Sequence, residues 1–279
     1  MNGRADAWSG RVMGTTASVI VHGGSVEAGE LASWLAALER RWSRFLPDSE
    51  ISRWNSARLP DDRAGVERGW SADTRSLVAR AGEARRLTEG RFDAWVADRM
   101  VALGYDRTYR ELPSERPPAL SIVAEDAHRP FACFDPGGLG KGFAADLTAG
   151  RAMDAGAHGV LVEVGGDVVT RGWAPDGGPW VVEAERSDGG AVRIELLDGA
   201  VATSDPDVRT WTVGSRRIRH VIDPLDGTPV RPVGPVTIVA GEGWWAEAVA
   251  TAALVSRSRG DGWFDEARAH ACNVEVVAA

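Results

Sequence analysis

The feature that most constrains the fold is a series of short apolar runs between residues 159 and 222. Residues typical of turns separate the runs, so each run is predicted to be a β-strand. Consecutive strands joined by short turns pair antiparallel, whereas neighbouring parallel strands need a long crossover segment between them. The predicted strands are 159–164, 168–172, 180–184, 192–197, 201–204, 208–213 and 218–222.

Predicted helices stand on both sides of this series, and several place their apolar side chains at intervals of three and four residues, on one helical face. We expect helices at 30–45, 72–88, 141–155, 246–255 and 261–270, and further strands at 16–21, 236–240 and 272–277. Prolines within 112–129 predict a surface excursion. This mixture predicts an α+β fold with mixed, largely antiparallel sheets flanked by helices, rather than a parallel doubly wound sheet.

Composition limits the domain organisation and the class of partner. The chain has 279 residues, of which 44% are apolar, enough for a sizeable core. No repeat, charge block or flexible linker marks a boundary, so we expect a single domain over residues 1–279. The net charge of −8 argues against non-specific nucleic-acid binding, which needs a basic excess. Because we find neither a signal-peptide pattern nor an apolar run long enough to span a membrane, we expect a cytoplasmic location without membrane insertion.

The segment FDPGGLGKGFAAD, residues 134–146, contains Lys141, the only lysine among 32 basic residues. Its glycines leave the backbone uncovered just before a predicted helix, and amides at a helix N-terminus attract phosphate. A lysine ammonium adds a compact charge that can reach a phosphoryl oxygen. The spacing matches neither a Walker loop nor a Rossmann fingerprint. The segment is therefore either a phosphate site or a glycine-rich turn with a solvated lysine.

Three further segments carry polar residues with more than one interpretation. In LVEVGGDVVTRG, Asp167 follows a second glycine pair, for which a tight β connection is the simpler interpretation. In RHVIDPLDGTP, His220 is either a packed residue or a catalyst. In WWAEAVATAAL, Glu247 and Thr251 stand four residues apart and share one helical face. Their oxygen atoms suit Mg²⁺, while a solvated glutamate is the alternative.

Taken together and in order, these segments resemble the ApbE family, whose best-known members are FAD:protein FMN transferases. The resemblance extends from about Met13 to Leu254. The motifs that carry it are VMGTTASVIV, FLPDSEISRWN, TEGRFDAWV, FDPGGLGKGFAAD, VEVGGDV, RHVIDP and AEAVATAAL. The resemblance implies an ApbE-like layered domain.

The resemblance also implies roles for particular residues. Those that would bind the flavin nucleotide are Met13, Phe45, Arg91, Phe92, Asp93, Asp135 and Lys141. Lys141 would lie near the pyrophosphate or ribose end of FAD and, with His220 near the reacting end, would act in catalysis. The Gly138 carbonyl and the side chains of Glu247 and Thr251 would hold Mg²⁺.

The implied function is Mg²⁺-dependent transfer of FMN from FAD to a Thr or Ser hydroxyl of a target flavoprotein, with release of AMP. Two alternatives remain open. One is an FAD pyrophosphatase that releases FMN and AMP, and the other is a non-catalytic FAD-binding protein whose metal site has decayed.

Three positions depart from the family's pattern. Glu247 stands where Asp is usual, and its side chain is one methylene longer. Ser204-Asp205 replaces the usual Ser-Gly, and the added carboxylate would either help a metal or repel a pyrophosphate. Ala94-Trp95 follows the GxFD motif where Pro-Thr is common.

Overall fold

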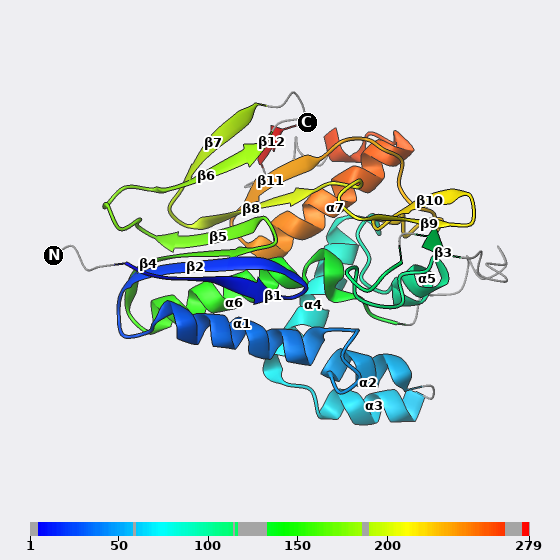
Figure 1. Ribbon diagram of the computed structural model, residues 1–279, viewed down its shortest axis with the longest axis horizontal. Coiled ribbons are helices and arrows are strands. Elements are labelled where there is room, and N and C mark those ends of the chain that lie inside the picture. Colours follow the sequence, from blue (N-terminus) through cyan, green and yellow to red (C-terminus); the bar gives the residue numbers. More distant parts are fainter. Residues whose placement is uncertain are drawn as a thin grey trace.

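The computed structural model describes residues 5–57, 60–113, 115–116, 133–185, 190–265 and 275–278. Its centre is a seven-stranded sheet in the order β1-β2-β4-β5-β8-β11-β12, and every neighbouring pair is antiparallel (Figure 1). The strands are β1 Asp6–Val12, β2 Thr15–Gly23, β4 Ala157–Val164, β5 Asp167–Gly172, β8 Gly199–Ser204, β11 Val236–Ala240 and β12 Glu275–Ala278. The predicted α+β class with largely antiparallel sheets is confirmed.

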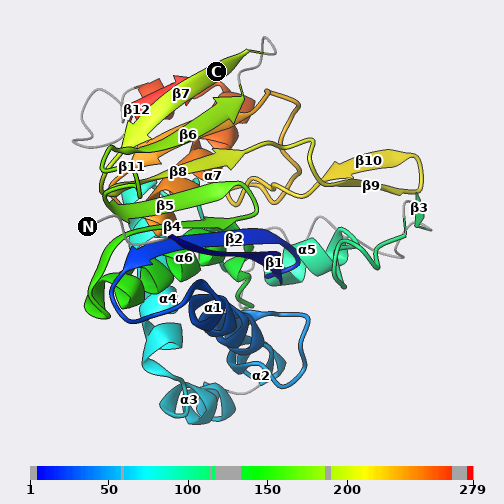
Figure 2. The same cartoon turned by 60° about the vertical axis from the view of Figure 1, so that its left-hand side comes forward.

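Two smaller sheets accompany the large one. Strands β6 (Trp180–Glu185) and β7 (Ala191–Leu196) form an antiparallel pair. Strands β9 (Thr210–Val213) and β10 (Arg216–Arg219) form a hairpin, and β3 (Glu115–Arg116) pairs parallel with β9. Figure 2 shows this hairpin projecting away from the main sheet.

The strand predicted at 218–222 is displaced in the structure. It is β10, which ends at Arg219, so His220 follows the strand instead of lying within it. Gly214 has a φ of 60°, a left-handed conformation that glycine adopts without strain. β10 therefore begins two residues before its predicted start, and both β9 and β10 are shorter than the sequence pattern suggests.

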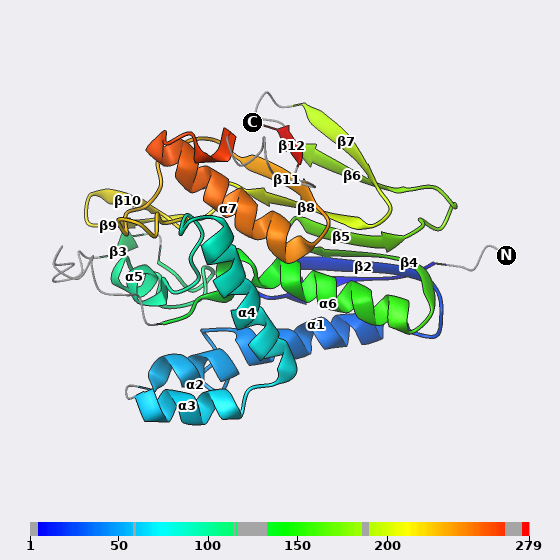
Figure 3. The same ribbon diagram turned by 180° about the vertical axis from the view of Figure 1, so that it is seen from behind.

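Four long helices lie on one side of the main sheet (Figures 1 and 3). They are α1 Ala28–Trp42, α4 Ala72–Leu87, α6 Gly140–Asp154 and α7 Gly243–Arg259. Helices α1, α6 and α7 pack on the strands, and α4 packs against α1 and α7. Helix α6 packs on β4 and β5, and α7 packs on β8 and β11, with the main apolar core between helices and sheet. Helix α7 extends beyond the predicted 246–255 and ends at Arg259, followed by the left-handed Gly260 with a φ of 71°.

Short helices account for most of the elements that sequence reasoning missed. They are α2 Glu50–Ser56, α3 Pro60–Arg68, α5 Ala97–Ala102 and the 3₁₀ turn η2 Pro136–Gly138. Of the helix predicted at 261–270, residues 263–265 are helical and 266–270 lie outside the described residues. The predicted excursion at 112–129 lies outside them too, apart from 112–113 and 115–116. Across the described ranges, every helix falls short of the length and apolar character that a membrane crossing requires.

Helices α6 and α7 approach so closely that only glycine fits at their contact. A Cβ atom on Gly142 would lie 2.3 Å from the carbonyl oxygen of Gly243. Asp146, one α6 turn further along, accepts hydrogen bonds from the backbone amides of Gly243 and Trp244, both at 2.9 Å. The carboxylate therefore caps the N-terminus of α7. These contacts place Lys141 on α6 beside Glu247 on α7.

Candidate functional site

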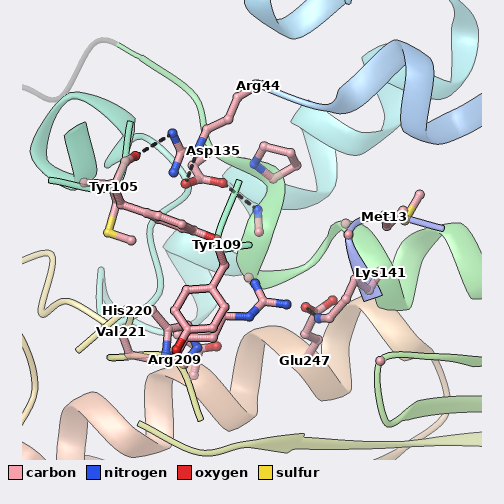
Figure 4. Close-up of a pocket in the computed structure, with 18 of the residues that line it drawn as sticks. Met13, Arg44, Tyr105, Tyr109, Asp135, Lys141, Arg209, His220, Val221 and Glu247 are labelled. Carbon is pink, nitrogen blue, oxygen red and sulfur yellow. Dashed lines mark hydrogen bonds and ion pairs between the residues drawn. The ribbon is translucent and has the colours of Figure 1, made fainter. Parts of the chain in front are cut away.

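A cleft of about 550 Å³ opens beside the N-terminus of α6. It is lined by the β1–β2 turn, the segment after α1, η2, the end of β8, the segments flanking the β9–β10 hairpin, and α7. Most residues predicted for the site line it: Met13, Phe45, Phe92, Asp93, Asp135, Gly138, Lys141, His220, Glu247 and Thr251. Figure 4 shows the Lys141–Glu247 pair and the His220–Arg209 group in different parts of this cleft.

Lys141 lies between two carboxylates. Its Nζ is 2.7 Å from Asp167 Oδ2 and also forms an ion pair with Glu247 Oε1. The other oxygen of Glu247 accepts a hydrogen bond from the Gly142 amide at 2.9 Å. The other oxygen of Asp167 accepts one from the Thr203 amide at 3.3 Å. The lysine is therefore not a freely solvated charge.

This group carries more negative than positive charge in a buried place. The side chains of Asp167 and Glu247 are each 5% exposed, and that of Lys141 is 21% exposed. Burial raises the pKa of the Glu247 carboxyl above its ordinary value, against the opposing effect of Lys141. Burial alone would lower the pKa of Lys141, but the charges of Asp167 and Glu247 outweigh it and hold that pKa above its usual range.

Sequence reasoning assigned Asp167 only to a tight connection. Gly165 and Gly166 have φ values of 65° and 92°, which turns the chain sharply between β4 and β5. Asp167 is the first residue of β5, so this turn directs its carboxylate to Lys141. The second glycine pair predicts the turn, but no local pattern links Asp167 to Lys141, which lies on α6.

Oxygen donors suited to a hard cation line the same cleft as this group. Thr251 Oγ1 lies 3.3 Å from Ser204 Oγ, one turn of α7 beyond Glu247. Gly138 faces the same cleft, and a Cβ there would meet the Phe92 ring at 2.9 Å. Within the described ranges, no three His, Cys, Asp or Glu side chains gather as a metal centre. Two carboxylates, two hydroxyls and a surplus negative charge nevertheless form a donor set that fits Mg²⁺.

Asp135 and Arg44 form a second charged pair in the cleft. Arg44 Nε lies 2.8 Å from Asp135 Oδ2, and the Gly137 amide donates to Asp135 Oδ1 at 2.9 Å. Arg44 also donates to the carbonyl of Tyr105 at 3.0 Å, and its guanidinium lies over the rings of Phe45 and Tyr105. Sequence reasoning did not identify Arg44 or Tyr105, because their partners are remote in the chain.

His220 contributes a neutral imidazole. Its backbone amide donates to the Arg209 carbonyl at 3.1 Å, directly after β10. Burial, followed by the charge of Arg209, lowers the pKa of His220 to about 4, so the ring is uncharged at pH 7. Within the described residues its buried Nδ1 has no hydrogen-bond partner.

The stretch from residue 91 to 93 divides between the cleft and the surface beside it. Phe92 is buried against Gly138, and Asp93 pairs with Arg85 at 2.9 Å. Arg91 is the predicted site residue that the structure does not bring to the cleft. Its guanidinium instead lies 2.9 Å from Asp261 and over the Trp263 ring. Asp261 follows the end of α7 and draws Arg91 away.

Two of the departures from the family's pattern have local structural roles. Asp205 lines the cleft, and its Oδ1 accepts a hydrogen bond from the Asp207 amide at 2.8 Å, which stabilises the turn after β8. Trp95 packs edge-on against Phe134, with ring centroids 5.3 Å apart. Both residues therefore stabilise segments that border the cleft.

Comparison with known proteins agrees with this fold and site. A profile of the ApbE family matches residues 13–274. An FAD:protein FMN transferase from Chlamydia trachomatis is 32% identical over 147 residues, which cover 51% of this chain and 45% of the relative. Another from Vibrio cholerae is 28% identical over 272 residues, covering 88% of this chain and 80% of the relative.

A solved structure gives the same result for the fold. The ApbE protein from Thermotoga maritima superposes with a TM-score of 0.79 at 23% identity, covering 98% of this chain and 94% of that chain. The family profile spans most of the sequence and every residue that lines the cleft except Arg11 and Val12. The chain belongs to the ApbE family.

Proposed function

We propose that this chain is a Mg²⁺-dependent FAD:protein FMN transferase that moves FMN from FAD to a Thr or Ser hydroxyl of a target flavoprotein and releases AMP. Its family and the names of its relatives support flavin transfer. The observation that carries the proposal is that Lys141, Asp135, His220 and the oxygens of Glu247 and Thr251 line one cleft. They come from segments far apart in the chain and supply cationic, anionic and proton-accepting groups together.

The cleft suits a flavin nucleotide in size and polarity. Its volume of about 550 Å³ lies within the range of small-molecule sites. Phe45, Tyr105 and Val208 supply apolar walls, and Asp135 is held by Arg44 where it could accept hydrogen bonds from a ribose or a base. Met13, at the tip of the β1–β2 turn, would contact the flavin.

The reaction exchanges one phosphorus–oxygen bond for another. The acceptor hydroxyl oxygen would attack the phosphorus on the FMN side of the pyrophosphate, and the bond from that phosphorus to the AMP oxygen would break. The Lys141 ammonium would offset charge that accumulates on the departing phosphate. Bound Mg²⁺ would supply Lewis-acid neutralisation of the pyrophosphate, and Glu247, Thr251 and the Gly138 carbonyl would hold it.

A proton must leave the acceptor hydroxyl during this exchange, and His220 is the proposed acceptor of that proton. Its imidazole is neutral because burial lowers its pKa to about 4. The negative charge of a bound pyrophosphate would raise that pKa and strengthen the base.

The test incubates the purified chain with FAD, MgCl₂ and an unflavinylated flavoprotein that carries FMN on threonine in its mature form. We expect the partner's mass to rise by FMN less one water, with AMP released in equal amount. Excess EDTA should abolish both. AMP with free FMN and no added mass would identify a pyrophosphatase, and FAD binding without AMP would identify a non-catalytic carrier.

A further inference from the structure

We propose that the Lys141 ammonium and a divalent cation compete for one buried pair of carboxylates, Asp167 and Glu247. Lys141 occupies the pair when the metal is absent and is released toward the substrate when the metal binds. Asp167 thereby becomes the second carboxylate of the cation site, a role that sequence reasoning did not give it. The inference deepens the proposed function and rests on it for the use of a divalent cation.

Asp167 and Glu247 share one charged partner. Within the part of the chain that the structure describes, the ion pairs of Asp167 and of Glu247 are both with Lys141. Their remaining oxygens accept backbone amides, from Thr203 and Gly142 respectively. Among the described residues, the ammonium is thus the charged partner that both carboxylates share, and it occupies the position that a second cation would need.

The two carboxylates carry more charge than the lysine ammonium can balance. When both carboxylates are ionised, two carboxylates facing one ammonium carry a surplus of one negative charge, and each carboxylate side chain is only 5% exposed. A divalent cation bound to the same two carboxylates would change the net charge of the group from negative to positive. It would therefore repel the Lys141 ammonium from contact distance. Because both carboxylates are held by amides from α6 and β8, the lysine side chain is the flexible member that has to move.

Lys141 lies at the border between the buried carboxylates and the open cleft. Its side chain is 21% exposed and lines the cleft, so part of it already faces the space a ligand would enter. A released ammonium needs a new anionic partner, and the pyrophosphate of FAD provides one. Metal binding and substrate binding would therefore support each other through one lysine.

The sequence offers a direct test that needs no mutation. Lys141 is the only lysine, so metabolic labelling with lysine that carries ¹³C at Cε alone gives a single Cε resonance in the full chain. We expect that resonance to shift as MgCl₂ is added without FAD, and to saturate with the metal-binding isotherm. A lysine signal that stays in place while metal saturates the site would overturn the proposal.

A second measurement follows Mn²⁺ binding by EPR at pH 8, without FAD or acceptor. Removing the competing charge in Lys141→Met should tighten Mn²⁺ binding by about tenfold or more. Asp167→Asn, which keeps an oxygen for the Thr203 amide, should weaken it by about tenfold. Arg151→Met removes the same charge from the far end of α6 and is the matched control, expected to stay within about twofold of the native protein.

The outcomes separate this inference from the proposed function. Unchanged or weaker Mn²⁺ binding in Lys141→Met would mean that the ion pairs are only structural, and would overturn the competition whatever the transfer assay shows. Tighter binding together with a native protein that never transfers FMN would support the competition and refute the transferase.

Discussion

The contact between α6 and α7 holds Lys141 beside Glu247, and Gly142→Ala tests it. The added Cβ would lie 2.3 Å from the Gly243 carbonyl oxygen and 2.9 Å from the Trp244 amide nitrogen. Both neighbours are backbone atoms, so no side chain can rotate away. Relief requires the helices to separate by about 1 Å, which weakens van der Waals contact along their interface.

We expect Gly142→Ala to lower the free energy of unfolding by about 3 kcal/mol, at the upper end of overpacking costs. For a chain of this size that corresponds to a fall in Tm of roughly 6 °C. The substitution should also reduce FAD turnover, because the Gly142 amide holds Glu247.

Gly150→Ala is the matched control on the same helix. A Cβ at Gly150 would meet nothing within 4 Å, so only helix propensity and unfolded-chain entropy change. We expect it to raise stability by about 0.5–1 kcal/mol. The assay is thermal and urea unfolding followed by tryptophan fluorescence. If both variants change stability by the same amount and in the same direction, the close helix contact is refuted.

Substitutions at three further positions test the site and the helix contact beside it. Lys141→Ala should weaken FAD binding or turnover. Lys141→Arg should restore them poorly, because a planar guanidinium does not replace a compact ammonium. Equal FAD affinity by flavin fluorescence and equal turnover in the native protein and both variants would contradict a role of Lys141 in FAD binding. Burial raises the pKa of Asp146 from 3.8 to about 6. Between these two pH values the Asp146 carboxyl holds its proton in the native protein and loses it in the unfolded chain. The free energy of unfolding should therefore fall by up to about 3 kcal/mol as the pH rises from 4 to 6. Asp146→Asn should remove that part of the pH dependence in urea unfolding, and an unaltered slope would contradict the assignment. Glu247→Gln should abolish Mg²⁺-dependent AMP release and Glu247→Asp should not improve it, whereas a silent native protein rescued by Asp would indicate a decayed site.

Long periodic elements were predictable from sequence because their own residues carry the pattern. The alternating and apolar runs of β4, β5, β8 and β11 lie near their predicted positions, as do α1, α4 and α6. Helix α3 was missed because PDDRAGVER has few apolar residues and no stripe to mark a buried face. Strand β1 was missed because it lies at a sheet edge and buries only Val12.

The site residues also differ in whether their own sequence motifs identify them. Lys141, His220, Glu247 and Thr251 stand in motifs whose order alone indicated the family, and each lines the cleft. Arg44 was not predictable because its importance lies in a pairing with Asp135, and no local spacing reports a partner so distant in the chain. Whether residues 1–279 form a single domain remains a prediction.

The structure changes the meaning of the glycine-rich segment. From sequence, its exposed amides and helix N-terminus suggested a phosphate site. In the structure the Gly137 amide is taken by Asp135 and the Gly142 amide by Glu247, so carboxylates already occupy two donors that a phosphate would use. The glycines serve instead to bring α6 against α7 and Phe92 against Gly138. An anionic substrate would therefore depend on charge carried by side chains and by a bound cation more than on the loop's backbone. That dependence gives a physical reason for a lysine at position 141: a compact ammonium can be shared between two carboxylates and then be transferred to a pyrophosphate.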